Sequence, residues 1–195
     1  NSSLDGFAIN FNSTKDISYK KGKLAYREAG FGSVLFLLHG MNGSSKSWAN
    51  FFKGLSSSHR IIAWDAPSFG YSDCFGDSIL DYKNAAKTLL HELSIDKALI
   101  IGHSMGGVIA VQLAADPSMV ISGLVLSSSH LGFAVPKGED LIPRYANRLK
   151  YFNNRVIPKK YSFDRAKFST PRGTSENIIK FLANVSQDLR IESIR

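Results

Sequence analysis

The sequence predicts a doubly wound α/β fold with a mostly parallel sheet, and two observations carry this prediction. First, short runs of consecutive apolar residues recur along residues 1–130. Strands that are apolar on both faces are typical of parallel sheets covered by helices. Second, helical patterns separate these runs, and strands that alternate with helices at this spacing favour right-handed crossover connections.

Six segments are candidate strands. Residues 16–29 contain two short segments around the turn Lys21-Gly22, which we expect to pair in antiparallel fashion. Four apolar runs follow, at residues 34–38, 61–64, 98–101 and 124–126. We expect these four to form the parallel part of the sheet.

Three helical patterns lie between the apolar runs, at residues 45–55, 78–93 and 104–115. In the second, Ser78 precedes Asp81 at the spacing of a capping box. Its apolar residues fall on one helix face, namely Ile79, Tyr82, Ala86, Leu89, Leu90 and Leu93. The third ends near Asp116-Pro117, because proline cannot continue a helix.

The pattern changes after about residue 130, where helical segments continue without a strand between them. A helix beginning near Thr174 or Ser175 places four apolar residues on one face, namely Ile178, Phe181, Leu182 and Val185. We therefore divide the chain into a core at 1–130 and a helical cap at 131–195. We also expect the chain to be cut before the last core strands, since it ends without a helix stop signal.

Composition and charge limit the classes of function. The 195 residues are 44% hydrophobic, yet no apolar run approaches the ~20 residues of a membrane span. The single cysteine, Cys74, excludes an internal disulfide, and no signal-peptide pattern opens the chain, so we expect a cytoplasmic protein. The chain starts at Asn1 rather than Met, however, so a leader could have preceded it.

The net charge of +8 comes entirely from the C-terminal part of the chain. Residues 1–140 carry 12 basic and 12 acidic residues, whereas residues 141–195 carry 12 basic and 4 acidic ones. The basic residues are scattered among apolar ones and no nucleic-acid motif accompanies them. We interpret them as the solvated face of helices and predict no nucleic-acid partner; a basic membrane or nucleic-acid surface is the alternative.

The chemistry is indicated by Gly102-His103-Ser104-Met105-Gly106, a G-x-S-x-G pattern with an apolar run directly before it and a helical pattern directly after it. A sharp strand-to-helix turn of this kind raises the serine at its apex. Gly102 and Gly106 flank the apex because side chains there would collide across the turn. We predict Ser104 as a nucleophile; the alternative is a serine that only caps a helix.

A second loop supplies what the nucleophile needs. The apolar run 34–38 ends in His39-Gly40-Met41-Asn42-Gly43-Ser44. Acyl transfer passes through a tetrahedral oxyanion that backbone N–H donors stabilise by roughly 3–4 kcal/mol each. We predict the Met105 amide, which follows the nucleophile, and the Met41 amide as these donors. An ordinary glycine-rich turn is the alternative for this loop.

These motifs resemble the α/β-hydrolase superfamily, and most closely its capped esterases, lactonases and carbon–carbon hydrolases. The resemblance rests on His39-Gly40, on residues 64–73 from Trp64-Asp65 to Ser72-Asp73, and on residues 102–107, and it covers nearly all of residues 15–130. It implies an eight-stranded sheet, of which about six strands are present here, and a helical cap after the sixth. It also implies that Asp65 braces loops and has no catalytic role.

The catalytic base is the missing part. A serine hydroxyl needs a histidine that an acid orients, in the chain order Ser, acid, His. Only His130 follows Ser104, and only Asp116 lies between them as a carboxylate. We expect the acid and the histidine beyond Arg195. His130 we assign to the substrate pocket, together with His39, Gly40 and His103.

The prediction is therefore a serine hydrolase that acts on a carboxylic ester, a lactone or a related small acyl substrate. The reaction needs no metal and no organic cofactor. A protein of this fold that only binds its ligand, or an inactive fragment that lacks acid and histidine, is the alternative. Haloalkane and epoxide hydrolases are disfavoured because they carry aspartate at the position of Ser104. The oligomeric state cannot be predicted from these patterns.

Overall fold

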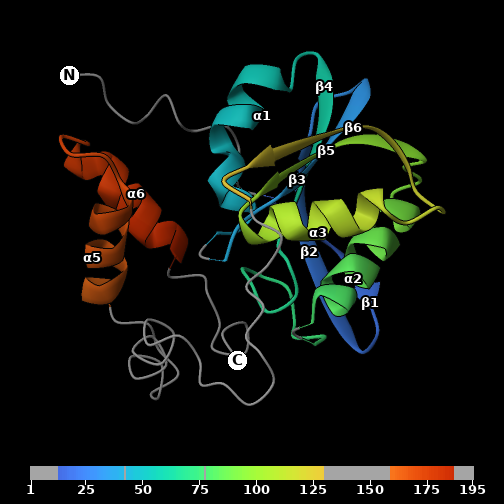
Figure 1. Ribbon diagram of the computed structural model, residues 1–195, viewed down its shortest axis with the longest axis horizontal. Coiled ribbons are helices and arrows are strands. Elements are labelled where there is room, and N and C mark those ends of the chain that lie inside the picture. The colour runs from blue at the N-terminus through green and yellow to red at the C-terminus, as the bar shows by residue number, and fades with distance from the viewer. Residues whose placement is uncertain (1–12, 42, 77, 130–158, 187–195) are drawn as a thin grey trace.

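A six-stranded sheet with helices on both faces forms the centre of the molecule (Figure 1). The structure, a computed structural model, describes residues 13–41, 43–76, 78–129 and 159–186. The strands are β1 (Lys15–Tyr19), β2 (Gly22–Ala29), β3 (Ser33–Leu38), β4 (His59–Trp64), β5 (Lys97–His103) and β6 (Val120–Ser127). They lie in the order β1-β2-β4-β3-β5-β6.

The pairing confirms a mostly parallel sheet. β3 pairs in parallel with both β4 and β5, and β5 pairs in parallel with β6. The hairpin of β1 and β2 joins the sheet through an antiparallel pairing of β2 with β4. β6 begins four residues before the predicted run 124–126. The apolar pattern does not reveal this first half because Ser122 and Gly123 interrupt it. Ile121 pairs with Ala98 and Gly123 with Leu99, so Ser122 is an extra residue in the ladder.

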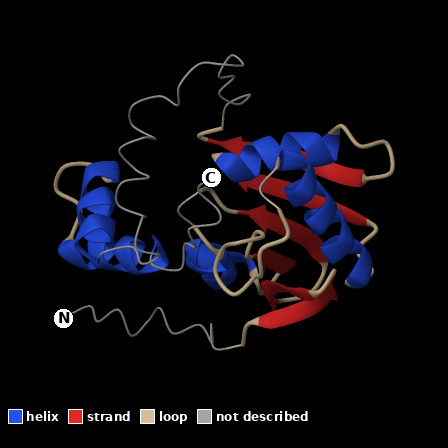
Figure 2. Ribbon diagram, turned by 90° about the horizontal axis from the view of Figure 1, so that it is seen from below, coloured by secondary structure: helices blue, strands red, loops and turns tan. Residues whose placement is uncertain are grey.

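Alternate residues of the central strands face two separate cores. The helical elements between the strands are η2 (Ser45–Trp48), α1 (Ala49–Leu55), α2 (Ile79–Glu92) and α3 (Met105–Ala114). Leu35 and Leu37 of β3 pack with Phe52 of α1 on one face, whereas Phe36 and Leu38 belong to the core under α2 and α3. Each fully buried side chain of this size contributes about 1.5–3 kcal/mol. The helices thus cover both faces, as the sequence predicts for a doubly wound sheet (Figure 2).

The predicted capping box of α2 is present. The Asp81 amide donates to the Ser78 hydroxyl at 3.1 Å, and the Ser78 amide donates to the Asp81 carboxylate at 3.3 Å. Hydrogen bonds from Ser78 also hold the pKa of Asp81 below its ordinary value. Two amides that would lack partners at the helix start are therefore satisfied.

Two further helices, α5 (Lys159–Ser169) and α6 (Glu176–Ser186), pack against each other at the side of the sheet domain (Figure 1). Their shared core contains Ala166, Ile179 and Ala183. Of the face predicted to be apolar, Ile178, Phe181 and Leu182 are exposed by 49%, 39% and 36%, and only Val185 is buried. A cap at 131–195 stays a prediction, since residues 130–158 and 187–195 lie outside the described part of the chain.

The outer edge of the sheet carries apolar side chains that the described residues do not cover. β6 pairs with β5 on one side, and among the described strands none pairs with its other side. Leu124, Val125 and Leu126 are 36%, 45% and 46% exposed. In the described ranges, no helix is both long enough and apolar enough to cross a bilayer.

Candidate active site

Ser104 stands at the bend between β5 and α3 in a backbone conformation that side chains rarely adopt. Its φ is +51° and its ψ is −115°. The Ser104 amide donates to the Ser127 carbonyl at the end of β6, and its carbonyl accepts from the Gly107 amide, both at 2.9 Å. One hydrogen bond thus ties the residue to the neighbouring strand while the other begins the helix. A strained residue held from both sides is what a nucleophile elbow requires.

Close packing explains the two glycines of the motif. A Cβ on Gly102 would lie 2.5 Å from the Gly106 carbonyl oxygen and 2.6 Å from the Gly107 Cα. A Cβ on Gly106 would lie 2.7 Å from the carbonyl oxygen of His39. No side chain fits at either position unless the backbone moves. The helix start therefore lies directly against the strand end and the loop after β3, which is how the sequence pattern is expected to work.

The Ser104 hydroxyl is not used to cap α3. A capping serine accepts a hydrogen bond from an amide two or three residues on, and no such bond is present. The side chain is partly exposed. The interpretation of Ser104 as a simple helix cap is therefore not supported. Its hydroxyl stands at the N-terminus of α3, where the helix dipole favours negative charge.

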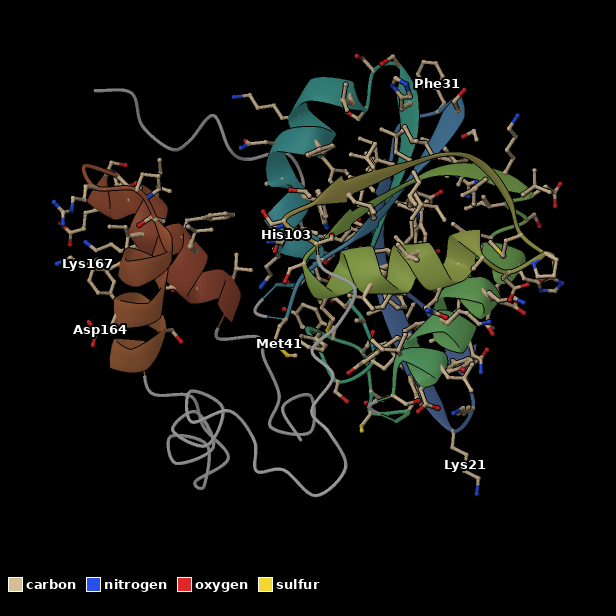
Figure 3. The ribbon with its side chains drawn as sticks, in the orientation of Figure 1. Lys21, Phe31, Met41, His103, Asp164 and Lys167 are labelled. Atoms are coloured by element: carbon tan, nitrogen blue, oxygen red, sulfur yellow. The ribbon has the colours of Figure 1, made fainter. Side chains whose placement is uncertain are left out.

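The loop after β3 lies against the elbow. A Cβ on Gly40 would be 3.1 Å from the Cβ of Ser104 and 3.0 Å from Cδ2 of His103. His103 is exposed, and Met41 packs partly against the larger core. Figure 3 shows Met41 and His103 on the side of the sheet that faces α5 and α6. The sequence prediction that this loop approaches the nucleophile thus agrees with the geometry.

The two amides predicted as oxyanion donors belong to the first residue of α3 and to the loop after β3. Met105 is the first residue of α3, so its amide has no acceptor within the helix. Among the described residues, the Met41 and Met105 amides donate no hydrogen bond to a backbone carbonyl outside the helices and strands. Their role as an oxyanion hole stays a prediction. Asn42, which follows Met41, lies outside the described residues.

His39 lies inside the protein, beneath the loop. Its ring is 1% exposed, Nδ1 donates to the Gly40 carbonyl at 2.8 Å, and Nε2 accepts from the Ala66 amide at 3.0 Å. Burial lowers the pKa of His39, and the nearby His103 lowers it further, while the Gly40 bond and Asp65 act in the opposite direction. Because Nε2 accepts from an amide and Nδ1 faces a carbonyl, the two hydrogen bonds fit a neutral ring with its proton on Nδ1. The predicted contact between His39 and a substrate stays a prediction.

Asp65 connects the loops around the site. This residue follows β4 and is 1% exposed. Its Oδ1 accepts from the Ser45 amide at 2.6 Å, and its Oδ2 accepts from the Tyr71 amide at 3.0 Å. Arg27, also buried, donates to the Ser45 hydroxyl at 3.0 Å. A carboxylate that accepts from two loop amides braces those loops, as the family resemblance implies.

None of the residues that the structure describes forms a hydrogen bond that would mark it as the base of Ser104. Among the described residues, no histidine is hydrogen-bonded to the Ser104 hydroxyl, and His130 lies outside them. Asp116 is at the far end of α3, where Lys87 contacts it at 2.8 Å and Lys83 at 3.2 Å. Hydrogen bonds from Lys87 and Ser118 hold its pKa well below the ordinary range. Asp116 is thus part of a surface ion cluster and too far along the helix to orient a base for Ser104.

Sequence reasoning did not find the hydrogen bonds of His39. A histidine directly after an apolar strand is compatible with a position in a pocket and with a buried position. The feature that separates the two is the donor on the neighbouring loop, the Ala66 amide, which is 27 residues away in sequence.

Comparison with known proteins agrees with this geometry. Residues 33–176 match the family described as alpha/beta hydrolase fold. A 2-hydroxymuconate semialdehyde hydrolase from a Pseudomonas species is 30% identical over 145 residues, which are 71% of this chain and 50% of that protein. Matched segments cover 31% to 50% of the curated relatives' own length.

Two solved structures show the same fold. A hydrolase from Pseudomonas aeruginosa superposes with a TM-score of 0.78 at 17% identity and covers 95% of this chain and 71% of that one. An esterase from Exiguobacterium antarcticum superposes with a TM-score of 0.75 at 18% identity and covers 89% of this chain and 67% of that one. Because the family match spans most of the chain, the protein belongs to the α/β-hydrolase fold family.

Proposed function

We propose that the full-length protein is a serine hydrolase that cleaves a carboxylic ester, a lactone or a related small acyl compound through an acyl-enzyme at Ser104. One observation carries this proposal. Ser104 is held at +51° and −115°, and its hydroxyl makes no cap bond to the helix behind it. A strained backbone with an unused hydroxyl at a helix N-terminus has no structural purpose that we can identify, whereas a nucleophile needs all three features.

The chemistry follows from the elbow and the facing loop. The Ser104 oxygen attacks the carbonyl carbon of the substrate, and the hydroxyl proton passes to a base. The carbonyl oxygen becomes an anion, which the Met41 and Met105 amides stabilise. Collapse of this intermediate expels an alcohol, which takes the proton, and leaves an ester on Ser104. Water then adds to that ester, and the acid and the free serine are released.

The relatives support the class of reaction and leave the substrate open. Proteins that match this chain bear the names 2-hydroxymuconate semialdehyde hydrolase and esterase. Hydrolysis of an ester by a serine enzyme begins with attack at a carbonyl carbon, and this is the step that we propose for Ser104. Substrate choice in this fold depends on residues around the pocket mouth, so the ester or lactone preference belongs to the proposal.

A fluorophosphonate probe tests the nucleophile, since it reacts with activated serines. We expect the full-length protein to be labelled, with the adduct located on Ser104 by peptide mass spectrometry. Ser104→Ala should lose the label, whereas Ser129→Ala, in the loop after β6, should retain it. Hydrolysis of p-nitrophenyl esters of increasing acyl length measures the activity itself.

Absence of both labelling and ester hydrolysis in the folded wild-type protein would contradict the proposal. That result would favour the alternative, in which the hydrolase fold binds a ligand without chemistry. The fold state is checked by circular dichroism, so that an unfolded sample is not counted as an inactive enzyme.

A further inference from the structure

The carbonyl of Gly40 is held by two donors that point it into the protein. The Nδ1 of His39 donates to it at 2.8 Å, and the Gly43 amide donates to it at 2.9 Å. The His39 ring is fixed in turn by the Ala66 amide at 3.0 Å and by the Phe69 ring, whose centroid is 5.1 Å away. Both nitrogens of the buried ring therefore take part in holding the loop.

The direction of the Gly40 carbonyl decides the direction of the next amide. Carbonyl and N–H of one trans peptide unit lie in a plane and point to opposite sides, and no cis peptide bond is present in the described chain. Because the Gly40 oxygen points to the buried His39 ring, the Met41 N–H points away from that ring. Gly40 itself lies against Ser104, with a distance of 3.1 Å between a Cβ built on it and the serine Cβ.

We infer that His39 is a positioning residue for hydrolysis, which sets the orientation of the Met41 amide through its hydrogen bond to the Gly40 carbonyl. The inference rests on the proposed function, since it concerns the oxyanion that forms when Ser104 attacks. In this role His39 does not make the direct substrate contact that the sequence predicts. His39 acts through the peptide unit between Gly40 and Met41, and the Ala66 amide keeps its Nε2 as the acceptor.

Two conservative variants separate the two hydrogen bonds of the ring. His39→Asn places an amide nitrogen where Nδ1 stands, so it retains a donor for the Gly40 carbonyl but loses the acceptor for Ala66. His39→Gln extends an amide to the position of Nε2, so it retains the Ala66 acceptor but loses the donor for Gly40. His91→Gln is the matched control, because the His91 side chain is 87% exposed.

The measurement is kcat and KM for p-nitrophenyl butyrate with the full-length protein. Loss of a complete oxyanion donor lowers kcat by about 10²–10³. We expect His39→Gln to lower kcat by at least about tenfold with KM nearly unchanged, because the Met41 amide serves the transition state more than the ground state. His39→Asn should retain kcat within about threefold of the wild type, and His91→Gln should match the wild type.

A purely structural role would give a different result. Equal kcat values for His39→Asn and His39→Gln would overturn the inference, as would a rise in KM with kcat unchanged. Circular dichroism and denaturant titration of each variant ensure that kcat is compared between folded proteins.

Failure of the proposed function is recognised separately. If the wild type neither hydrolyses the ester nor reacts with the fluorophosphonate, the serine hydrolase assignment fails and the role of His39 falls with it. If the wild type is active and Ser104→Ala is not, the comparison of the two His39 variants decides the inference alone.

Discussion

Replacing Ser104 by glycine tests whether the elbow stores backbone strain. With φ at +51° and ψ at −115°, Ser104 lies outside the regions that residues with a Cβ favour. Such a conformation costs about 1–3 kcal/mol for a non-glycine residue and almost nothing for glycine. The hydroxyl caps no amide of α3, so removing it should change the free energy of unfolding little. Glycine also makes the unfolded chain more flexible, which costs the folded state about 0.5–1 kcal/mol.

The balance predicts that Ser104→Gly raises the free energy of unfolding by about 1 kcal/mol. Ser104→Ala is the matched control, because it removes the same hydroxyl but keeps the Cβ and therefore the strain. We expect Ser104→Ala to stay within about 0.5 kcal/mol of the wild type. Urea denaturation of the full-length protein, followed by circular dichroism, measures the three free energies.

The difference between the two variants is the decisive quantity. If alanine stabilises the protein as much as glycine does, the backbone at Ser104 is not strained and the gain has another origin. If both variants destabilise the protein, the hydroxyl has a partner that stabilises the folded state. In either case the identification of the elbow as a strained nucleophile site would lose its physical basis.

Three further predictions concern neighbouring positions. Ser68 is fully buried at φ +69°, and its hydroxyl has no hydrogen-bond partner among the described residues. Ser68→Gly should therefore raise the free energy of unfolding, measured by denaturant titration, by about 1–2 kcal/mol. Gly106→Ala should lower the free energy of unfolding by about 1–3 kcal/mol, because the new Cβ meets the backbone of Leu38 and His39 at the end of β3. Gly54→Ala, with open space around it, should raise the free energy of unfolding by about 0.5–1 kcal/mol, and equal effects of the two variants would contradict the packing argument. Burial lowers the pKa of His39 from 6.5, so the unfolded state binds more protons than the folded state below that pH. The free energy of unfolding should therefore fall by up to about 1.4 kcal/mol for each unit that the pH drops below 6.5. A His39→Gln variant with the same dependence on pH would refute this.

The strands, the helices and the elbow could be predicted because each depends on residues close together in the chain. The continuous apolar run 34–38 predicts a strand that is buried on both faces, and its last four residues are indeed 0–4% exposed. Gly102 is required by contacts across one turn, with Gly106 and Gly107, whereas Gly106 is required by the distant end of β3. The capping box of α2 involves only Ser78 and Asp81. Local geometry of this kind is encoded in spacing, so one sequence is enough to reveal it.

Contacts between distant segments required the tertiary structure. Nothing in the sequence near His39 indicates that the Ala66 amide donates to its ring, or that the Gly40 carbonyl accepts a hydrogen bond from it. The packing of α6 also required the tertiary structure. The periodic pattern identifies the helix and predicts that Ile178 and Phe181 lie on its buried face. The residues that pack against α5 are instead Ile179 and Ala183. A pattern shows which residues share a face, whereas the packing partner decides which face is buried. The sequence by itself therefore determined the family and the position of Ser104, and the packing of distant loops decided how the groups around that serine are held.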